Sequence, residues 1–132
     1  VCDGLGLGDN SKAALITRSL AELIRLGVAL GGQRDTFQGL SGIGDLMVTC
    51  FSRHSRNRAV GERLGRGERL ADIVTSMNMV AEGVPTTYSA YECARRLGVE
   101  TPIIDQMRSL LDGTQTAREV ATNLLTRETK SE

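Results

Sequence analysis

The fold is decided by residues 4–32, GLGLGDNSKAALITRSLAELIRLGVALGG, a glycine-rich start followed by a long apolar pattern. Gly4, Gly6 and Gly8 stand at alternate positions. Apolar residues then recur at helical spacing from Ala13 to Leu30, and two glycines follow. Asn10 or Ser11 suits the N-cap of such a helix, because each carries a short polar side chain. The stretch therefore predicts a sharp turn that leads into a long, largely buried helix.

The same glycines raise the alternative of a loop that holds a nucleotide phosphate. A dinucleotide fingerprint needs a third glycine where this sequence has Asp9 or Ser11, and the nearest downstream acid, Glu22, lies inside the predicted helix. A Walker A loop needs a glycine before Lys12 and a hydroxyl after it, and both are missing. We therefore favour packing as the role of the glycines, with Asn10 and Lys12 left as candidates to face a site.

The rest of the chain continues the helical pattern. Hydrophobic residues make up 40% of the 132 residues but aromatic residues only 3%, which favours helix packed on helix over a β-sandwich. Further helices are predicted over residues 37–50, 55–64, 70–77, 85–97, 102–111 and 114 or 116 to 125. Glycines inside 37–50 indicate close backbone contact there. We expect an all-α domain over residues 1–125 and a frayed polar tail over 126–132.

Composition excludes several classes of function. Lysine plus arginine number 16 and aspartate plus glutamate 16, and this balance argues against a nucleic-acid or polybasic membrane partner. Cys2, Cys50 and Cys93 are scattered and His54 is the single histidine, so neither a disulfide framework nor a metal site is expected. His54 stands beside arginines, as surface histidines often do. No apolar run approaches the ~18 residues of a membrane span, and we expect a cytoplasmic protein.

The strongest functional signal lies in residues 39–61, GLSGIGDLMVTCFSRHSRNRAVG. Asp45 is a single carboxylate in an apolar, glycine-rich run, so it is either paired with a cation or used in chemistry. Ser55, Arg56 and Asn57 stand at a predicted helix N-terminus, where free N–H groups and a guanidinium suit an anion. These residues predict a small polyol phosphate site. The open alternative is a solvated arginine helix with a buried Asp45 paired to one of its arginines.

Three segments, residues 8–27, 39–67 and 79–103, together resemble the C-terminal domain of the bacterial NAD(P)-dependent glycerol-3-phosphate dehydrogenase. The block G-[IL]-G-D-L-x-x-T-C followed by S-R-N-R is specific to that family. The resemblance implies a helical substrate and dimerisation domain of the 6-phosphogluconate-dehydrogenase C-terminal type. It also implies an oxidoreductase that interconverts sn-glycerol 3-phosphate and dihydroxyacetone phosphate for phospholipid synthesis.

The resemblance also assigns site residues and partners. The substrate-binding residues that it implies are Asp45, Ser55, Arg56 and Asn57, with Thr49 added from a threonine near the substrate in eukaryotic relatives. Arg56, Val80 and Glu82 belong by the same resemblance to the site of the cofactor, NAD or NADP. The implied partners are an N-terminal Rossmann domain and a second copy in a homodimer.

In the family, a lysine upstream of the glycine-rich stretch is the general acid and base. This sequence begins after that position, and Lys12 belongs to a different family segment, so no catalytic residue is expected here. We therefore expect a fragment without dehydrogenase activity of its own, an expectation that NAD(P)H turnover by this chain would contradict. Two alternatives remain: a dimerisation module without ligand, and the helical domain of another small-phosphate or hydroxy-acid dehydrogenase.

Overall fold

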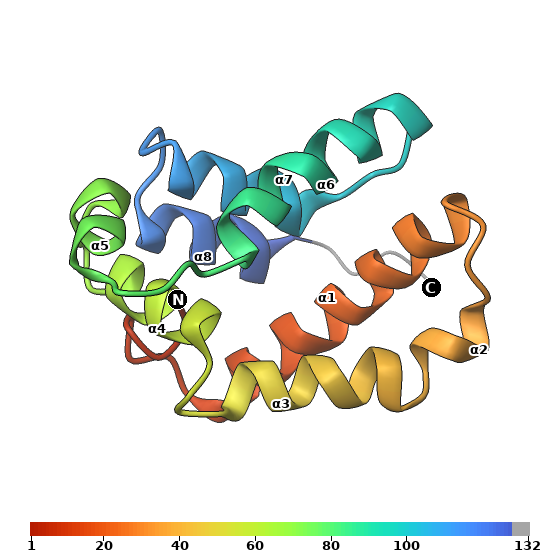
Figure 1. Ribbon diagram of the computed structural model, residues 1–132, viewed down its shortest axis with the longest axis horizontal. Helices are drawn as coiled ribbons and strands as arrows, with labels where there is room; N and C mark the ends of the chain where they lie inside the picture. Colours follow the sequence, from red (N-terminus) through yellow and green to blue (C-terminus); the bar gives the residue numbers. More distant parts are fainter. Residues whose placement is uncertain (128–132) are drawn as a thin grey trace.

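The computed structural model describes residues 1–127, and among these residues every regular element is helical (Figure 1). The elements are α1 (Asp9–Ala29), α2 (Arg34–Phe37), the π-helical turn η1 (Leu40–Gly44), α3 (Asp45–Phe51), α4 (Arg56–Gly65), α5 (Leu70–Ser76), α6 (Gly83–Leu97), α7 (Pro102–Leu111) and α8 (Ala117–Thr126). The predicted all-α class is confirmed. Thr126, the first residue of the predicted tail, is still helical, and residues 128–132 lie outside the described part.

The main core lies among α4, α5, α7 and α8. Its buried residues are Val60, Leu64, Ile73, Ala81, Leu110, Leu111, Ala117, Val120 and Leu124. Short aliphatic side chains fill this core, as the low aromatic content predicts. Local caps fix two of the helices: Thr116 and Glu119 form a reciprocal capping box at α8, and Gly98 ends α6 in the left-handed region.

The predicted first helix is present, but it is less buried than expected. α1 begins directly after Gly8 rather than at Asn10 or Ser11. Ile24 is buried on the face that meets the rest of the domain, while Leu23 on another face is 40% exposed. α1 packs on α2, α7 and α8 (Figure 1), but only Glu22, Ile24 and Leu26 are buried along it, so the prediction of a largely buried helix is wrong.

The glycine turn before α1 packs against α4. A Cβ atom on Gly4 would stand 2.0 Å from the carbonyl oxygen of Glu62, and one on Gly65 would stand 2.4 Å from the carbonyl oxygen of Val1. Gly6 has a φ of +69°, a conformation that L side chains rarely adopt. The two backbones therefore touch only because both positions lack a side chain. This contact supports the predicted packing role for Gly4, whereas a Cβ atom on Gly6 or Gly8 would meet nothing within 4 Å.

The predicted helix over residues 37–50 is wrong as a continuous element. α2 ends at Phe37, the chain leaves the helix at Gly39, and η1 and α3 follow. The Phe37 ring lies against α1, where a Cβ atom on Gly27 would stand 2.1 Å from the ring. A Cβ atom on Gly42 would stand 2.0 Å from the Phe37 carbonyl oxygen. The predicted close backbone contact is thus real, and it interrupts the helix.

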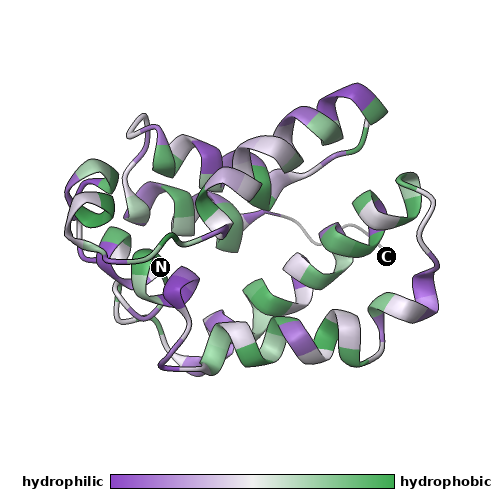
Figure 2. Ribbon diagram, in the orientation of Figure 1, coloured by the Kyte–Doolittle hydropathy of each residue, from purple (hydrophilic) through white to green (hydrophobic). Residues whose placement is uncertain are grey.

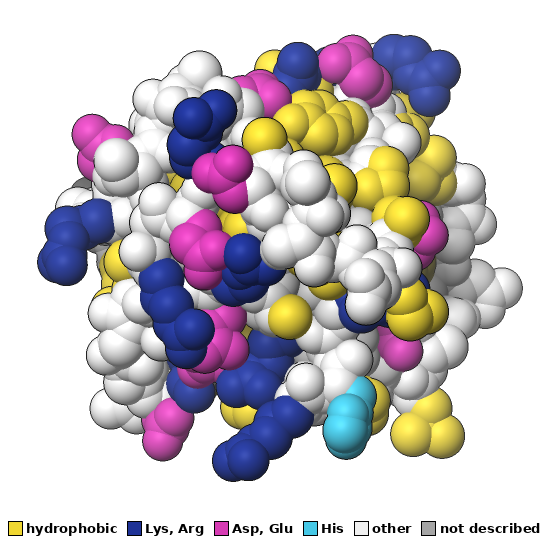
Figure 3. Space-filling model, turned by 60° about the vertical axis from the view of Figure 1, so that its left-hand side comes forward, with side chains coloured by type: hydrophobic (Ala, Val, Ile, Leu, Met, Phe, Trp, Pro, Cys, Tyr) yellow, Lys and Arg dark blue, Asp and Glu magenta, His cyan; other side chains and the backbone are white. Residues whose placement is uncertain are grey.

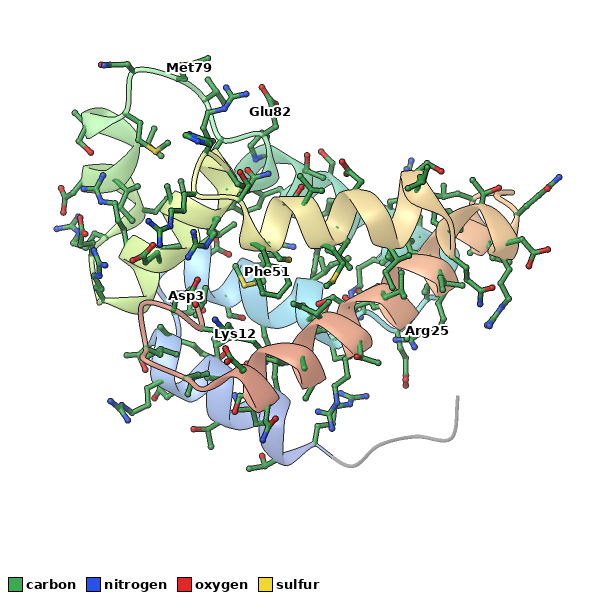
Figure 4. All side chains as sticks on the ribbon, turned by 90° about the horizontal axis from the view of Figure 1, so that it is seen from below. Asp3, Lys12, Arg25, Phe51, Met79 and Glu82 are labelled. Carbon is green, nitrogen blue, oxygen red and sulfur yellow. The ribbon has the colours of Figure 1, made fainter. Side chains whose placement is uncertain are left out.

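An apolar surface on η1 and α3 has no partner among residues 1–127. Leu40 is 91% exposed, and Val48 and Phe51 are also exposed. Hydrophobic residues run along η1 and α3 in Figure 2, and Phe51 lies between α3 and α1 in the view of Figure 4. Nowhere in residues 1–127 is a helix long and apolar enough to cross a membrane. We call Leu40, Ile43, Met47, Val48 and Phe51 the α3 apolar face.

A carboxylate from α1 caps the N-terminus of α7. The two oxygens of Glu22 accept hydrogen bonds from the N–H groups of Ile103 and Ile104, each at 2.8 Å. The side chain of Thr101, the N-cap residue of α7, makes no such bond, so Glu22 replaces the local cap from 81 residues away. Glu22 is only 2% exposed, and this burial raises its pKa although both N–H bonds and nearby Arg25 oppose the shift.

The raised pKa of Glu22 predicts how stability depends on pH. The folded state holds the Glu22 proton more tightly than the unfolded state, so the contribution of this residue to stability is greatest below about pH 4, near the pKa of an unfolded glutamate. It declines as the pH rises through the folded-state pKa. Urea unfolding at several pH values should show the difference in unfolding free energy between the native protein and Glu22→Gln falling with pH. A difference that grows with pH would contradict this assignment.

Candidate functional site

The candidate site is built on the first turn of α4. Ser55 is the N-cap, and its Oγ accepts a hydrogen bond from the N–H of Arg58 at 3.2 Å, as the sequence predicts. The N–H groups of Arg56 and Asn57 precede the first intrahelical bond, so they have no acceptor within α4. Two free N–H groups at the positive end of a helix dipole form a place where an anion binds favourably.

Arg56 and Asn57 also bring a distant segment to this turn. Arg56 donates from Nη1 to the carbonyl oxygen of Val80 at 2.9 Å, and the N–H of Gly83 donates to Oδ1 of Asn57 at 2.8 Å. Glu82 lies between these contacts, at the start of α6 and on the same connecting segment as Met79 (Figure 4). The structure thus brings Arg56 and Asn57, two of the predicted substrate-binding residues, to the segment that holds Val80 and Glu82, the predicted cofactor-binding residues.

Asn57 acts as an N-cap for a helix other than its own. Glu82 is the N-cap residue of α6 but makes no side-chain cap bond, and Asn57 supplies the acceptor from α4 instead. A Cβ atom on Gly83 would stand 2.8 Å from Oδ1 of Asn57, so any larger residue would displace the Asn57 side chain from this position. Because Oδ1 is used in this way, the Nδ2 group of Asn57 remains as the donor for a ligand.

Asp45 and Thr49 lie on the neighbouring helix α3, which packs against α4. They are four residues apart, so they share one face of α3. Asp45 is exposed, and within residues 1–127 it forms no ion pair. The alternative of a buried Asp45 paired with an arginine is therefore wrong. Thr49 is half-buried, and no direct bond joins either residue to Ser55 or Arg56.

Three of the six arginines between Arg53 and Arg69 already have a carboxylate. The pairs are Arg58 with Asp3, Arg63 with Glu68 and Arg66 with Glu62. Arg56 instead contacts a neutral carbonyl oxygen, so its positive charge is left for a ligand. Basic side chains gather near exposed His54 in Figure 3, and the backbone N–H of His54 donates to Ser52.

Sequence reasoning missed two contributors to this site. Gly83 gives no local signal, because its contact with Asn57 spans 26 residues. Asp3 accepts from Lys12 at 2.9 Å and from Arg58 at 2.9 Å, so Lys12 faces this carboxylate. Figure 4 shows Asp3 and Lys12 side by side.

In the described part of the chain, no group of three His, Cys, Asp or Glu side chains is arranged to hold a metal ion.

Comparison with known sequences identifies relatives over the whole chain. Residues 1–122 match the model of a family described as NAD-dependent glycerol-3-phosphate dehydrogenase C-terminus. The chain is 55% identical over 132 residues to a glycerol-3-phosphate dehydrogenase [NAD(P)+] of Citrifermentans bemidjiense and 52% identical to one of Chlorobium phaeobacteroides. These alignments cover 100% of this chain but 39% and 40% of the two relatives. The chain therefore spans about two fifths of their length.

A solved structure shares the fold. The crystal structure of glycerol-3-phosphate dehydrogenase from Coxiella burnetii superposes on 96% of this chain with a TM-score of 0.92 and 36% sequence identity. The alignment covers 39% of that crystallised chain. The helical arrangement described above is thus that of one part of a longer protein.

The contact between Asn57 and Gly83 predicts the effect of adding one methyl group. Gly83→Ala places a Cβ atom against Oδ1 of Asn57, so the cap of α6 should be lost, at a cost of about 1 kcal/mol in unfolding free energy. Gly44→Ala is the matched control, because its Cβ would meet only ordinary contacts from 3.5 Å and alanine is the better helix former. Urea unfolding of both variants checks this, and equal effects would argue against the cap.

Proposed function

The chain belongs to the NAD-dependent glycerol-3-phosphate dehydrogenase family, through the C-terminal part of that family, and we propose that it forms the substrate-binding half of such an enzyme's active site. The proposed reaction interconverts sn-glycerol 3-phosphate and dihydroxyacetone phosphate with NAD or NADP. The observation that supports it most is the first turn of α4, where free N–H groups, Arg56 and Asn57 meet the segment 80–83.

We assign the substrate phosphate to this turn. The N–H groups of Arg56 and Asn57 are suited to donate to phosphate oxygens, and the helix dipole favours the negative charge. The Arg56 guanidinium has five N–H donors and gives one to Val80, so a pair of donors remains for a bidentate contact. Nδ2 of Asn57 adds a neutral donor. Together these groups provide charge and direction for a phosphate dianion.

The glycerol end of the substrate is assigned to α3. Asp45 is an exposed carboxylate without a cation, so it is available to accept hydrogen bonds from substrate hydroxyls. Thr49, one helical turn further along the same face, offers a hydroxyl that both donates and accepts. Binding the two ends of a small molecule on two helices fixes its orientation, which is the contribution of this domain to the reaction rate.

The cofactor is assigned to the segment between α5 and α6. Val80 is exposed and apolar, Glu82 offers a carboxylate that can accept from hydroxyl groups, and Arg56, bonded to the Val80 carbonyl, offers a cation for phosphate. These groups fit one edge of NAD or NADP, which would exchange hydride with C2 of the substrate. The residues of this chain would bind and orient it; no proton transfer is assigned to them.

The rest of the active site is assigned to the part of the enzyme outside the matched region. The relatives are about two and a half times as long as this chain, and the α3 apolar face offers a surface for packing. We propose that a Rossmann domain and a general acid/base lysine come from that part and cover this face. A homodimer and a cytoplasmic location are further proposals that rest on the family alone.

Binding of glycerol 3-phosphate to this chain tests the phosphate assignment. Amide NMR shifts at residues 55–57 should change on titration, and Arg56→Met should weaken binding at least tenfold, because a charge-assisted contact of ~1.5 kcal/mol or more is lost. Arg66→Met is the matched control, since Arg66 is paired with Glu62 at the other end of α4. If no shifts occur at 55–57, the domain is an association module instead.

The reaction is tested by turnover. This chain and the same chain extended upstream by the family's N-terminal part should be compared for NAD(P)H oxidation with dihydroxyacetone phosphate. We expect turnover by the extended form alone, with KM for dihydroxyacetone phosphate raised by Arg56→Met because phosphate binding is weakened. Turnover by this chain alone would contradict the assignment of the catalytic lysine elsewhere, and an inactive extended form would mean a different substrate.

A further inference from the structure

Asp3 joins three parts of the domain through one carboxylate. Its Oδ1 accepts from Nζ of Lys12 in α1 at 2.9 Å. Its Oδ2 accepts from Nε and Nη2 of Arg58 in α4, at 3.0 and 2.9 Å. The three side chains are each about a quarter exposed, so solvent screens these contacts less than it screens pairs on an open surface. The guanidinium fork fixes the direction of Arg58 as well as its distance.

The Asp3 backbone is itself held firmly. Its carbonyl oxygen accepts from the N–H of Gly6 at 3.1 Å, and the adjacent Gly4 is in backbone contact with α4. Hydrogen bonds from Lys12 and Arg58 lower the pKa of Asp3, which keeps the carboxylate ionised at neutral pH. Asp3 is therefore a fixed negative charge that Arg58 reaches, rather than a mobile surface partner.

The contact lies on the opposite side of α4 from the segment 80–83. Arg56 and Arg58 are two residues apart, so their side chains leave the helix about 200° apart around its axis. Arg56 and Asn57 hold the α4 turn to Val80 and Gly83 on one side, and Arg58 holds it to Asp3 on the other. The backbone N–H of the same Arg58 is bonded to Ser55, the N-cap. Arg58 thus links Asp3 directly to the cap.

We propose that Asp3 is a positioning residue for phosphate binding, which acts through Arg58 to fix the first turn of α4. With Arg58 held, the N–H groups of Arg56 and Asn57 keep one direction, and Arg56 is the cation that meets the ligand. The inference rests on the proposed function of that turn. Asp3 does not touch the substrate, so its effect is on the geometry of groups that do.

The direction in which phosphate affinity changes distinguishes a positioning role of Asp3 from a purely electrostatic one. Removing the negative charge of Asp3 leaves Arg58 without its carboxylate and Lys12 with Asp9 alone, and by charge alone this would tighten phosphate binding. Loss of positioning weakens it instead. A contribution to fold stability alone would lower the unfolding midpoint and leave the affinity of the folded chain unchanged.

The test compares Asp3→Asn with Asp9→Asn in this chain. Asp9→Asn is the matched control, because it removes the same negative charge. The Asp9 carboxylate lies 3.4 Å from Nζ of Lys12, its side chain is 99% exposed, and it has no contact with Arg58. The dissociation constant of glycerol 3-phosphate is measured from amide shifts at fixed salt. We expect Asp3→Asn to weaken binding about three- to tenfold and Asp9→Asn to leave it unchanged or slightly tighter. Equal constants for the two variants, or tighter binding by Asp3→Asn, would overturn the proposal.

A double variant tests the route through Arg58. If Asp3 acts through Arg58, Asp3→Asn should have no further effect on the dissociation constant once Arg58→Met is present. Additive effects of the two substitutions would show that Asp3 acts by another route. Circular dichroism checks that each variant is folded. Arg58→Lys keeps the positive charge but loses the guanidinium fork, and it is used in place of any variant that does not fold.

Amide hydrogen exchange, measured without ligand, tests the role of Asp3 independently of the proposed function. The Arg58 amide is bonded to Ser55 Oγ, so its hydrogen exchange reports on the cap directly. Asp3→Asn should speed this exchange severalfold relative to Asp9→Asn, and unchanged exchange would overturn the positioning role. If the native chain binds no glycerol 3-phosphate, the proposed function fails, while exchange at Arg58 still decides whether Asp3 fixes the turn.

Discussion

The arrangement of the helices depends on one buried carboxylate. Glu22 satisfies two N–H groups at the start of α7, which no local side chain does, and it is only 2% exposed. Without these bonds, a charged group and a helix terminus would both be buried and unsatisfied, at a cost of several kcal/mol. The bonds therefore fix how α1 meets α7, and α7 in turn packs on α6 and α8.

The candidate site uses the same principle of capping at a distance. Asn57 caps α6 from α4, as Glu22 caps α7 from α1, and both contacts join elements far apart in the sequence. Close backbone packing at Gly4 and Gly65 brings the N-terminal turn to α4, which in turn places Asp3 beside Arg58. The polar groups proposed to bind phosphate are thus held by polar contacts on a scaffold of small residues.

Local signals in the sequence predicted the elements well. Helix boundaries are predictable where the capping residue acts within one turn of its own helix. The structure begins or ends a helix at each such residue: Ser55, Thr116 and Gly98. The break after Phe37 was not predictable in this way, since it follows from packing of that ring on Gly27. The bonds of Asn57 with Gly83 and of Asp3 with Arg58 span 26 and 55 residues, so no local pattern contains them.

Arg56 and Asn57 are neighbours in sequence, and each has a partner in the segment 80–83 besides its proposed ligand. If the proposed assignments hold, a substitution at either position alters the proposed substrate side of the site and the proposed cofactor side together. In an enzyme built on this turn, preference for a new substrate cannot evolve at these two positions independently of nucleotide binding. New specificity would have to arise on α3, where Asp45 and Thr49 share a face with no bond to that segment.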